Sequence, residues 1–104
     1  MDYAKYHQDR RNLLIHIIAV PVFVLGTGGL IWALLTANFL VALAFLAAPM
    51  LSLAAQGRGH RLEPVPPEPF AGPGDFIRRI VAEQFGRFWL FLVSGKWSKA
   101  LRGG

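Results

Sequence analysis

The sequence predicts an all-α, integral membrane chain built on a helical hairpin. An interfacial helix precedes the hairpin, and an interfacial or re-entrant amphipathic helix follows it. Apolar residues make up 54% of the 104 residues. No Asp, Glu, Lys or Arg occurs in the 46 residues between Arg11 and Arg58. Because a spanning helix needs about 20 mostly apolar residues, that interval holds two spans and a tight turn. The length suits one domain, residues 1–104.

Residues 1–12 are expected to form an interfacial arm. Tyr3, Tyr6, His7 and Arg10 have the spacing of one helix face, and tyrosines beside a span suit the headgroup layer. We expect this helix to break near Asn12. A secretory signal peptide is the competing interpretation. It fits poorly, because the apolar region that follows is longer than the roughly 7–15 residues of a signal core.

The two spans are predicted at 13–35 and 39–55, with the turn at "TAN", residues 36–38. Pro21 is expected to kink the first span, and Gly26, Gly28 and Gly29 allow a neighbouring helix to approach closely. The alternative turn is "GTGG". It would leave a first helix of about 14 residues, short of the roughly 17 needed to span.

The rest of the chain, residues 56–104, divides into a loop, a helix and a tail. Residues 56–74 hold five of the seven prolines, which predicts an ordered or extended loop. Residues 75–94 are predicted to be the interfacial or re-entrant helix, with Asp75 as N-cap. Residues 95–104 form a basic tail. The apolar face of the helix would contain Ile77, Ile80, Val81, Phe85, Phe88 and Leu92, and its other face Arg79, Glu83, Gly86 and Arg87.

Charge distribution predicts the orientation and the surroundings. The net charge is +5, and basic residues flank both outer ends of the hairpin, while the turn carries none. By the positive-inside rule both termini face the cytoplasm, and we expect a bacterial inner membrane. Nucleic-acid binding is disfavoured, because the basic residues form no stripe with interleaved aromatics. Anionic lipid headgroups are the expected counter-charge.

The three histidines of the chain, His7, His16 and His60, are all predicted near one membrane interface. Ionisable groups inside a span are costly, which makes His16 a functional candidate. The chain has no cysteine, so a metal would need imidazole, carboxylate or amide ligands. We predict a site for iron, zinc or another first-row metal. Residues expected as further ligands or as their neighbours are Glu63, Glu83, Gln84, Asn12 and Tyr6.

Structural roles for these side chains remain open as alternatives. His7 can be an interfacial side chain, His16 can bond across the helix pair, and His60 can be a loop residue. His7 and His16 are nine residues apart, so they would point to opposite sides of one straight helix, about 13 Å apart. They can share a metal only if the helix breaks, for which "DRRN" is the expected place. Arg61, beside His60, is the candidate for binding a substrate carboxylate.

Two segments carry a family resemblance. "YHQDRRNLLIHIIAVP" resembles the Y-H-x4-N-x3-H-x4-P opening of small membrane proteins related to the 2-hydroxy-palmitic acid dioxygenase. "QGRGHRLEPVPPEPFAGPGDF" is similar to the Q-G-x-G-H segment and Pro-rich continuation of bacterial members, and "EQF" and "SGKW" follow in the same order. The matching positions are Tyr6, His7, Asn12, His16, Pro21, Gln56, Gly57, Gly59, His60 and Glu63.

The resemblance implies an Fe(II)-dependent dioxygenase of lipid α-oxidation, which shortens a 2-hydroxy fatty acid by one carbon. Carried over, the iron ligands are His7, His16 and His60, with O₂ and a fatty acid as the other reactants. Fe(II) held by imidazoles leaves open positions for both. The chain is shorter than the longer members, and its single hairpin separates the histidine-containing arm from the Gly-His segment.

Two other classes compete with the dioxygenase. A non-catalytic membrane protein with a lipid-binding or structural role would tolerate His→Gln at positions 7 and 60. A metal-transport accessory would need polar residues deep in both spans, and the second span offers only Ser52. Two spans bury little surface, so we also expect that the chain can self-associate as a homo-oligomer.

Overall fold

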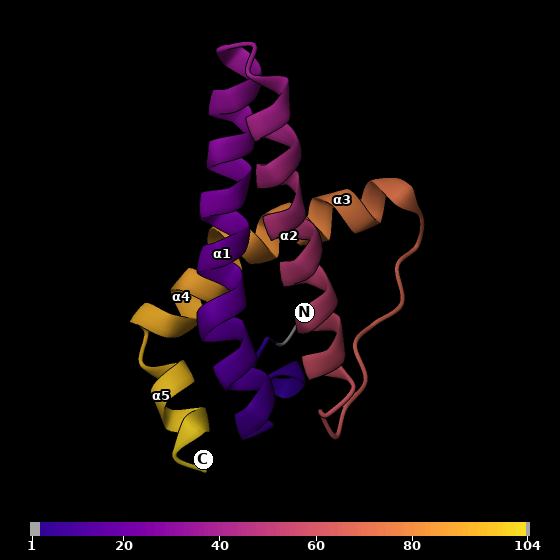
Figure 1. Cartoon of the computed structure of the whole chain (residues 1–104). Coiled ribbons are helices and arrows are strands. Elements are labelled where there is room, and N and C mark those ends of the chain that lie inside the picture. The colour runs from indigo at the N-terminus through magenta and orange to yellow at the C-terminus, as the bar shows by residue number, and fades with distance from the viewer. Residues whose placement is uncertain (1–2, 104) are drawn as a thin grey trace.

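The computed structural model describes residues 3–103, which are helical in seven segments and contain no strand (Figure 1). The all-α class predicted from the sequence is confirmed. Met1, Asp2 and Gly104, at the ends of the predicted arm and tail, lie outside the described residues. The segments in chain order are η1 (Ala4–Tyr6), α1 (Arg10–Leu35), α2 (Phe39–His60), α3 (Pro73–Ala82), η2 (Glu83–Arg87), α4 (Phe88–Val93) and α5 (Lys96–Leu101).

The long helices α1 and α2 lie side by side and antiparallel, joined by the turn at residues 36–38 (Figure 1). The predicted turn is therefore confirmed. Ala37 takes a left-handed φ of 55°, and the Asn38 side chain caps α2 by accepting a hydrogen bond from the Val41 N–H at 3.3 Å. The alternative turn at "GTGG" is wrong, because those residues lie inside α1.

The pairing of α1 and α2 depends on small side chains. The buried positions in the second half of α2 are spaced alternately by three and four residues, at Pro49, Ser52, Gln56 and Gly59. This spacing is typical of the seam between two closely packed helices. A Cβ on Gly26 would come within 2.6 Å of the Ala48 Cβ. The Ser52 hydroxyl donates to the carbonyl of Ala19 and links the helices where they touch.

The outer surface of the pair is apolar and exposed. Leu25 is 74% exposed, and Leu35 and Leu40 are each 82% exposed. Both helices are long and apolar enough to cross a membrane, and only about a quarter of their most apolar stretches is buried within the chain. Contiguous exposed apolar surface of this kind is typical of contact with lipid or with another protein.

The second helix is longer than predicted. The prediction ended it at residue 55, but α2 continues to His60, so His60 belongs to its last turn rather than to a loop. The "QGRGH" sequence has two glycines and no apolar period, which is why the sequence alone did not favour helix there. Tertiary packing decides the outcome, since Gln56 and Gly59 are buried against neighbouring segments.

The N-terminal arm is less helical than predicted. Among the described residues before α1, only the short 3₁₀ turn η1 is helical, and the chain is irregular from His7 to Asp9 before α1 begins at Arg10. The Asp9 side chain caps α1 by accepting from the Arg11 N–H at 2.8 Å. The predicted break between His7 and His16 is thus confirmed, but it precedes Arg10 instead of falling near Asn12.

The predicted helix at 75–94 is interrupted. It begins at Pro73 with Gly72 as N-cap, so the prediction of Asp75 as N-cap is wrong; Asp75 lies in the first turn, where it accepts from the Ala71 N–H. A π-helical turn, η2, follows α3 and shifts the helical register of the residues that come after it. The Trp89 indole donates to the Gln84 carbonyl at 2.8 Å across this turn.

The π turn changes which side chains of this helix face the hairpin. Phe88 is buried, whereas Ile77, Val81 and Phe85 of the predicted apolar face are about half exposed. Gln84 is fully buried, and Glu83, which was predicted on the face opposite the apolar one, is also largely buried. The helix crosses behind the hairpin (Figure 1).

The basic tail is partly helical. Helix α5 lies beside the lower part of α1 (Figure 1). The Trp97 indole donates to the Leu13 carbonyl at 3.1 Å, which fixes α5 against the first turn of α1. The end of the hairpin opposite the turn is therefore surrounded by the arm, α4 and α5.

Candidate metal centre

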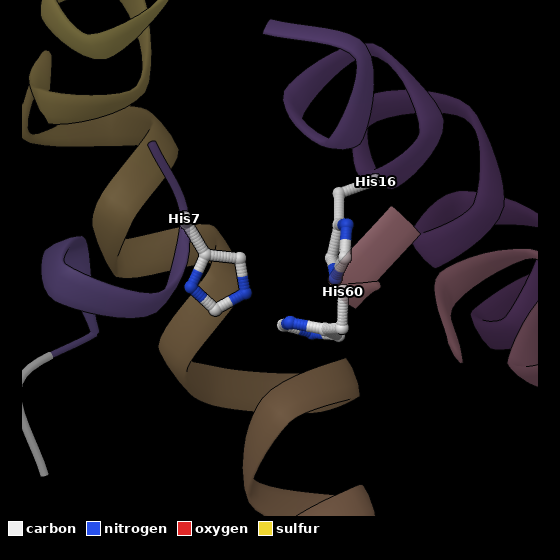
Figure 2. A group of neighbouring side chains, drawn as sticks. All are labelled: His7, His16 and His60. Atoms are coloured by element: carbon white, nitrogen blue, oxygen red, sulfur yellow. The ribbon is translucent and has the colours of Figure 1, made fainter. Parts of the chain in front are cut away.

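The three histidines converge from three separate segments (Figure 2). His7 lies in the break before α1, His16 in the second turn of α1, and His60 at the end of α2. The ring centroids are 4.8–4.9 Å apart in all three pairs, and each pair meets edge-on. One nitrogen from each ring lies within 4.8 Å of the other two. The sequence-predicted trio is therefore brought together in space.

Hydrogen bonds fix the orientation of two of these rings. Nδ1 of His7 lies 2.7 Å from the Tyr3 carbonyl, and Nδ1 of His16 lies 3.0 Å from the Asn12 carbonyl. Because a carbonyl oxygen only accepts, each Nδ1 must carry the proton and donate it. The lone pair of each ring is then left on Nε2. This is the arrangement that commonly orients metal-binding histidines.

The nitrogens that face one another lack partners. Nε2 of His7, Nε2 of His16 and Nδ1 of His60 are buried, and none has a hydrogen-bond partner among the described residues. A buried polar atom without a partner costs about 1–3 kcal/mol. A cation bound between the three lone pairs would remove that cost at all three atoms together.

The spacing fits a transition metal after a small adjustment. Imidazole nitrogens bind zinc at about 2.0–2.1 Å, so two ligands of one ion can be at most about 4.2 Å apart. The separation of up to 4.8 Å between the ring nitrogens exceeds that limit by a few tenths of an ångström. Small rotations of the three histidine side chains would move the ring nitrogens by that distance.

Burial keeps His7 in the form that binds metals. The pKa of His7 falls to about 3, chiefly because burial disfavours its charged form and also because His16 and His60 lie close by. A neutral imidazole is the form that ligates a cation. His7 is therefore available as a ligand throughout the ordinary pH range.

Glu83 is the acidic side chain nearest the cluster. Its Oε1 lies 3.8 Å from Nε2 of both His7 and His16, within the limit for two ligands of one ion. Burial raises the pKa of Glu83 to about 7, although the nearby Arg87 partly opposes this. Glu83 is a candidate fourth ligand, carried into place by the π turn.

Tyr3 is the functional residue that the sequence did not single out. Its hydroxyl donates to Glu83 Oε1 at 2.6 Å, and its ring stacks on His7 with centroids 3.7 Å apart and planes 4° from parallel. Burial and the Glu83 carboxyl raise the pKa of Tyr3. The helical spacing of Tyr3 and His7 was visible in the sequence, but nothing there connected Tyr3 with Glu83.

Glu63 supports the centre without facing it. Its carboxylate accepts hydrogen bonds from the Gln8 N–H at 2.5 Å, the Asp9 N–H at 2.9 Å and the Asn12 side-chain amide at 2.8 Å. With both oxygens occupied, Glu63 is oriented as a clamp on the irregular segment after His7 rather than toward the histidines. This clamp holds His7 opposite His16.

The other predicted neighbours of the ligands are engaged elsewhere. Gln84 exchanges two hydrogen bonds with Gln56, at 2.9 and 2.8 Å, and this pair joins the π turn to α2. The Tyr6 hydroxyl donates to Glu68 at 3.0 Å and ties the arm to the Pro-rich loop. Both contacts position the segments that carry the cluster.

Arg61 lies apart from the cluster, on the exposed side of the α2 terminus. A cavity beside the histidines contains two other arginines in its wall, Arg79 and Arg87. The sequence placed all basic residues near one interface without indicating which of them would face inward. A role for Arg61 in binding a carboxylate stays a prediction.

Comparison of the chain with protein-family models, with curated proteins and with solved structures finds no match.

Proposed function

We propose that the chain is an integral membrane, Fe(II)-dependent dioxygenase that shortens 2-hydroxy fatty acids by one carbon. One observation carries the proposal. Three imidazoles, two of them buried, converge with three buried and unpartnered nitrogens, and backbone carbonyls hold two of the rings in the metal-binding tautomer. A histidine cluster with only a structural role would be expected to pair these nitrogens with hydrogen-bond donors or acceptors.

The donor set is compatible with iron. Imidazole suits Fe, Zn, Cu and Ni, and a carboxylate beside it favours the harder ions of that series. The three histidines occupy the motif positions that resemble the iron ligands of the 2-hydroxy acid dioxygenase family. His7, His16 and His60 would hold the ion, with Glu83 beside it and Tyr3 fixing Glu83.

Two features of the chain support its placement in a membrane. The two helices long enough to cross a membrane expose most of their apolar surface, and basic residues lie at the end that carries the histidines. We place that end at the cytoplasmic interface. A fatty acid could then keep its chain among lipids while its head reaches the metal.

The proposed reaction is balanced without an external reductant. A 2-hydroxy acid, R–CH(OH)–COOH, reacts with O₂ to give R–COOH, CO₂ and H₂O. The bond between C1 and C2 breaks, and the four electrons lost by the substrate reduce O₂ completely. Fe(II), when bound, supplies the coordination and redox chemistry that allows O₂ to react. The chain contributes a buried, water-poor centre and positions the carboxylate and hydroxyl of the substrate.

The test is product formation from labelled substrate. Iron-loaded protein in detergent is supplied with O₂ and 2-hydroxypalmitate carrying ¹³C at C1, and pentadecanoate and ¹³CO₂ are quantified. We expect equal amounts of both products, none from unhydroxylated palmitate, and none from His16→Ala. Absence of pentadecanoate with iron-loaded, folded wild type would contradict the proposal and favour the lipid-binding or structural alternative.

A further inference from the structure

A cavity of about 390 Å³ lies next to the histidines. Its walls come from the N-terminal arm, the second half of α2, the Pro-rich loop that follows α2 and the α3–η2 helix. The volume is near the lower end of the roughly 300–1,000 Å³ of small-molecule sites, which suits one alkyl chain better than a two-chain lipid. The lining is mostly apolar and is contributed by Leu53, Pro67, Pro69, Phe70, Phe76 and Ile80.

The cavity extends from the histidines along the apolar length of α2. His60 lines it at the end of this helix, and Leu53 lines it two turns earlier, which is about 10 Å along the helix axis. Helix α2 is long and apolar enough to cross a membrane. Phe70 and Phe76 form an outer edge of the cavity, and both rings are almost half exposed. An occupant can therefore reach from the apolar surface of the protein to the histidines.

The wall of the cavity contains as many carboxyl groups as guanidinium groups. The carboxyl groups are bound within the chain. Glu68 accepts a hydrogen bond from the Tyr6 hydroxyl at 3.0 Å, and Glu83 accepts one from the Tyr3 hydroxyl at 2.6 Å. The four charged residues of the wall are Glu68, Glu83, Arg79 and Arg87.

The two arginines of the wall are engaged as well. Arg79 donates to the Pro69 carbonyl at 3.2 Å and lies 3.7 Å from Asp75. Arg87 has partners within the chain and also acts electrostatically on Glu83. A charged group that entered the cavity would therefore be buried without a counter-charge of its own, which is costly. An uncharged chain avoids that cost and gives the apolar lining the dispersion contacts that an empty space lacks.

We propose that this cavity binds a single uncharged alkyl chain that enters from the bilayer, and that recognition of the polar head is left to the histidine cluster. The proposal rests on the function proposed above, because it assigns the chain of the 2-hydroxy acid to the cavity and the hydroxyl and carboxylate to the metal. It makes the cavity indifferent to the charge of the head as long as no metal is bound.

The chain site is tested by filling it. Gly57 lines the cavity, and a Cβ there meets nothing within 4 Å, so Gly57→Phe adds a ring at the wall without a backbone clash. Gly28→Phe is the matched control, since Gly28 is equally open and does not line the cavity. Binding of hexadecane-1,2-diol to chelator-treated protein in nanodiscs is measured by displacement of a fluorescent alkyl probe. We expect a Kd at least about fivefold weaker in Gly57→Phe, the lower limit for overpacking, and no change in Gly28→Phe.

Photocrosslinking locates the chain in the wild type, independently of whether Gly57→Phe folds. The same diol with a diazirine in the middle of its chain should label Leu53, Phe70, Phe76 or Ile80, the apolar residues of the wall. Labelling spread over the lipid-facing surface of α1 and α2, with none at the cavity, would overturn the proposal. So would wild-type affinity in Gly57→Phe with an unchanged melting temperature.

Recognition of the head is tested with two probes that share one carbon chain. In chelator-treated protein, hexadecane-1,2-diol should bind at least as tightly as 2-hydroxypalmitate. Loading with Zn(II), which is redox-inactive, should then favour the acid over the diol by at least about tenfold, the lower limit for interactions with a charged group. His16→Ala should abolish this preference without changing diol binding, because His16 does not line the cavity. A clear preference for the acid without metal, or an equal response of both probes to Zn(II), would contradict the proposal.

The two proposals fail separately, because chain binding is measured without metal and without turnover. Displacement and crosslinking as expected, in a protein that forms no pentadecanoate, leave the chain site intact and remove the dioxygenase. Turnover by the wild type, together with chain binding that Gly57→Phe does not alter, leaves the dioxygenase intact and removes the chain site.

Discussion

The Glu63 carboxylate accepts a hydrogen bond of 2.8 Å from the side-chain amide of Asn12, joining the segment after α2 to the first turn of α1. The same carboxylate holds the backbone N–H groups of Gln8 and Asp9. Glu63 therefore holds the irregular segment between His7 and His16 in place through these three hydrogen bonds.

Replacement of Glu63 should open that segment. In Glu63→Ala three N–H donors lose their acceptor. We therefore expect the free energy of unfolding to fall by at least about 2 kcal/mol. Metal binding should also weaken, because His7 is no longer held in place. Glu63→Gln keeps one acceptor oxygen and should lose less. Chemical unfolding followed by circular dichroism measures the change. Lys99→Gln is the control, since Lys99 is exposed and lies in α5, away from this clamp; an equal loss there would contradict the clamp.

Gly59 sets the distance between the two long helices at the centre. A Cβ at this position would overlap Oδ1 of Asn12, whose side chain is fully buried and held by Glu63. Gly59→Ala should therefore cost about 1–3 kcal/mol, the range for overpacking. Gly57→Ala, where a Cβ has open space, should be neutral or stabilising by up to about 1 kcal/mol. Similar melting temperatures for the two variants would contradict this.

Tyr3 should act on the metal through Glu83. Tyr3→Phe keeps the ring that stacks on His7 and removes the hydroxyl that donates to Glu83. We expect a 10- to 100-fold loss in metal affinity, as for other groups that orient ligands, and a comparable or larger loss in Glu83→Gln. Metal titration with a competing chelator measures both. If Tyr3→Phe lowered thermal stability but left the metal Kd unchanged, the hydroxyl would be structural only.

The orientation in the membrane can be read from single cysteines, because the natural chain has none. Thr36→Cys marks the turn and Ser98→Cys marks α5; both positions are exposed. With intact bacterial cells, a membrane-impermeant maleimide should label Thr36→Cys and leave Ser98→Cys unlabelled until the cells are opened. The reverse pattern would invert the proposed topology.

The hairpin could be predicted because the apolar interval and the turn are local signals. The interval without charges and the short polar "TAN" defined both helices at that end. The opposite end could not be predicted equally well. Helix α2 extends to His60 because Gln56 and Gly59 are buried by segments distant in sequence, and propensity alone disfavours helix there.

The three histidines of the candidate centre could be predicted from the sequence, but the contacts around them could not. His7, His16 and His60 are the only histidines, and the topology places them at one end. The π turn was invisible to a periodicity argument, since it changes the register within one apparent helix. Glu83 was named from the sequence as a possible further ligand, but its position beside His7 and His16 could not be derived without this turn. Tyr3 was not singled out, and the arginines that line the cavity, Arg79 and Arg87, were not distinguished from Arg61.

The most direct measurement is the metal content of the chain and of its histidine variants. Protein purified anaerobically in detergent is loaded with Fe(II), desalted and assayed for iron, with Lys99→Gln, a change at an exposed position of α5, as a control. We predict close to one iron per chain in the wild type and the control, and loss of most of it in His7→Ala, His16→Ala and His60→Ala. A folded wild type that retains no iron, or His16→Ala that retains all of it, would contradict the metal centre.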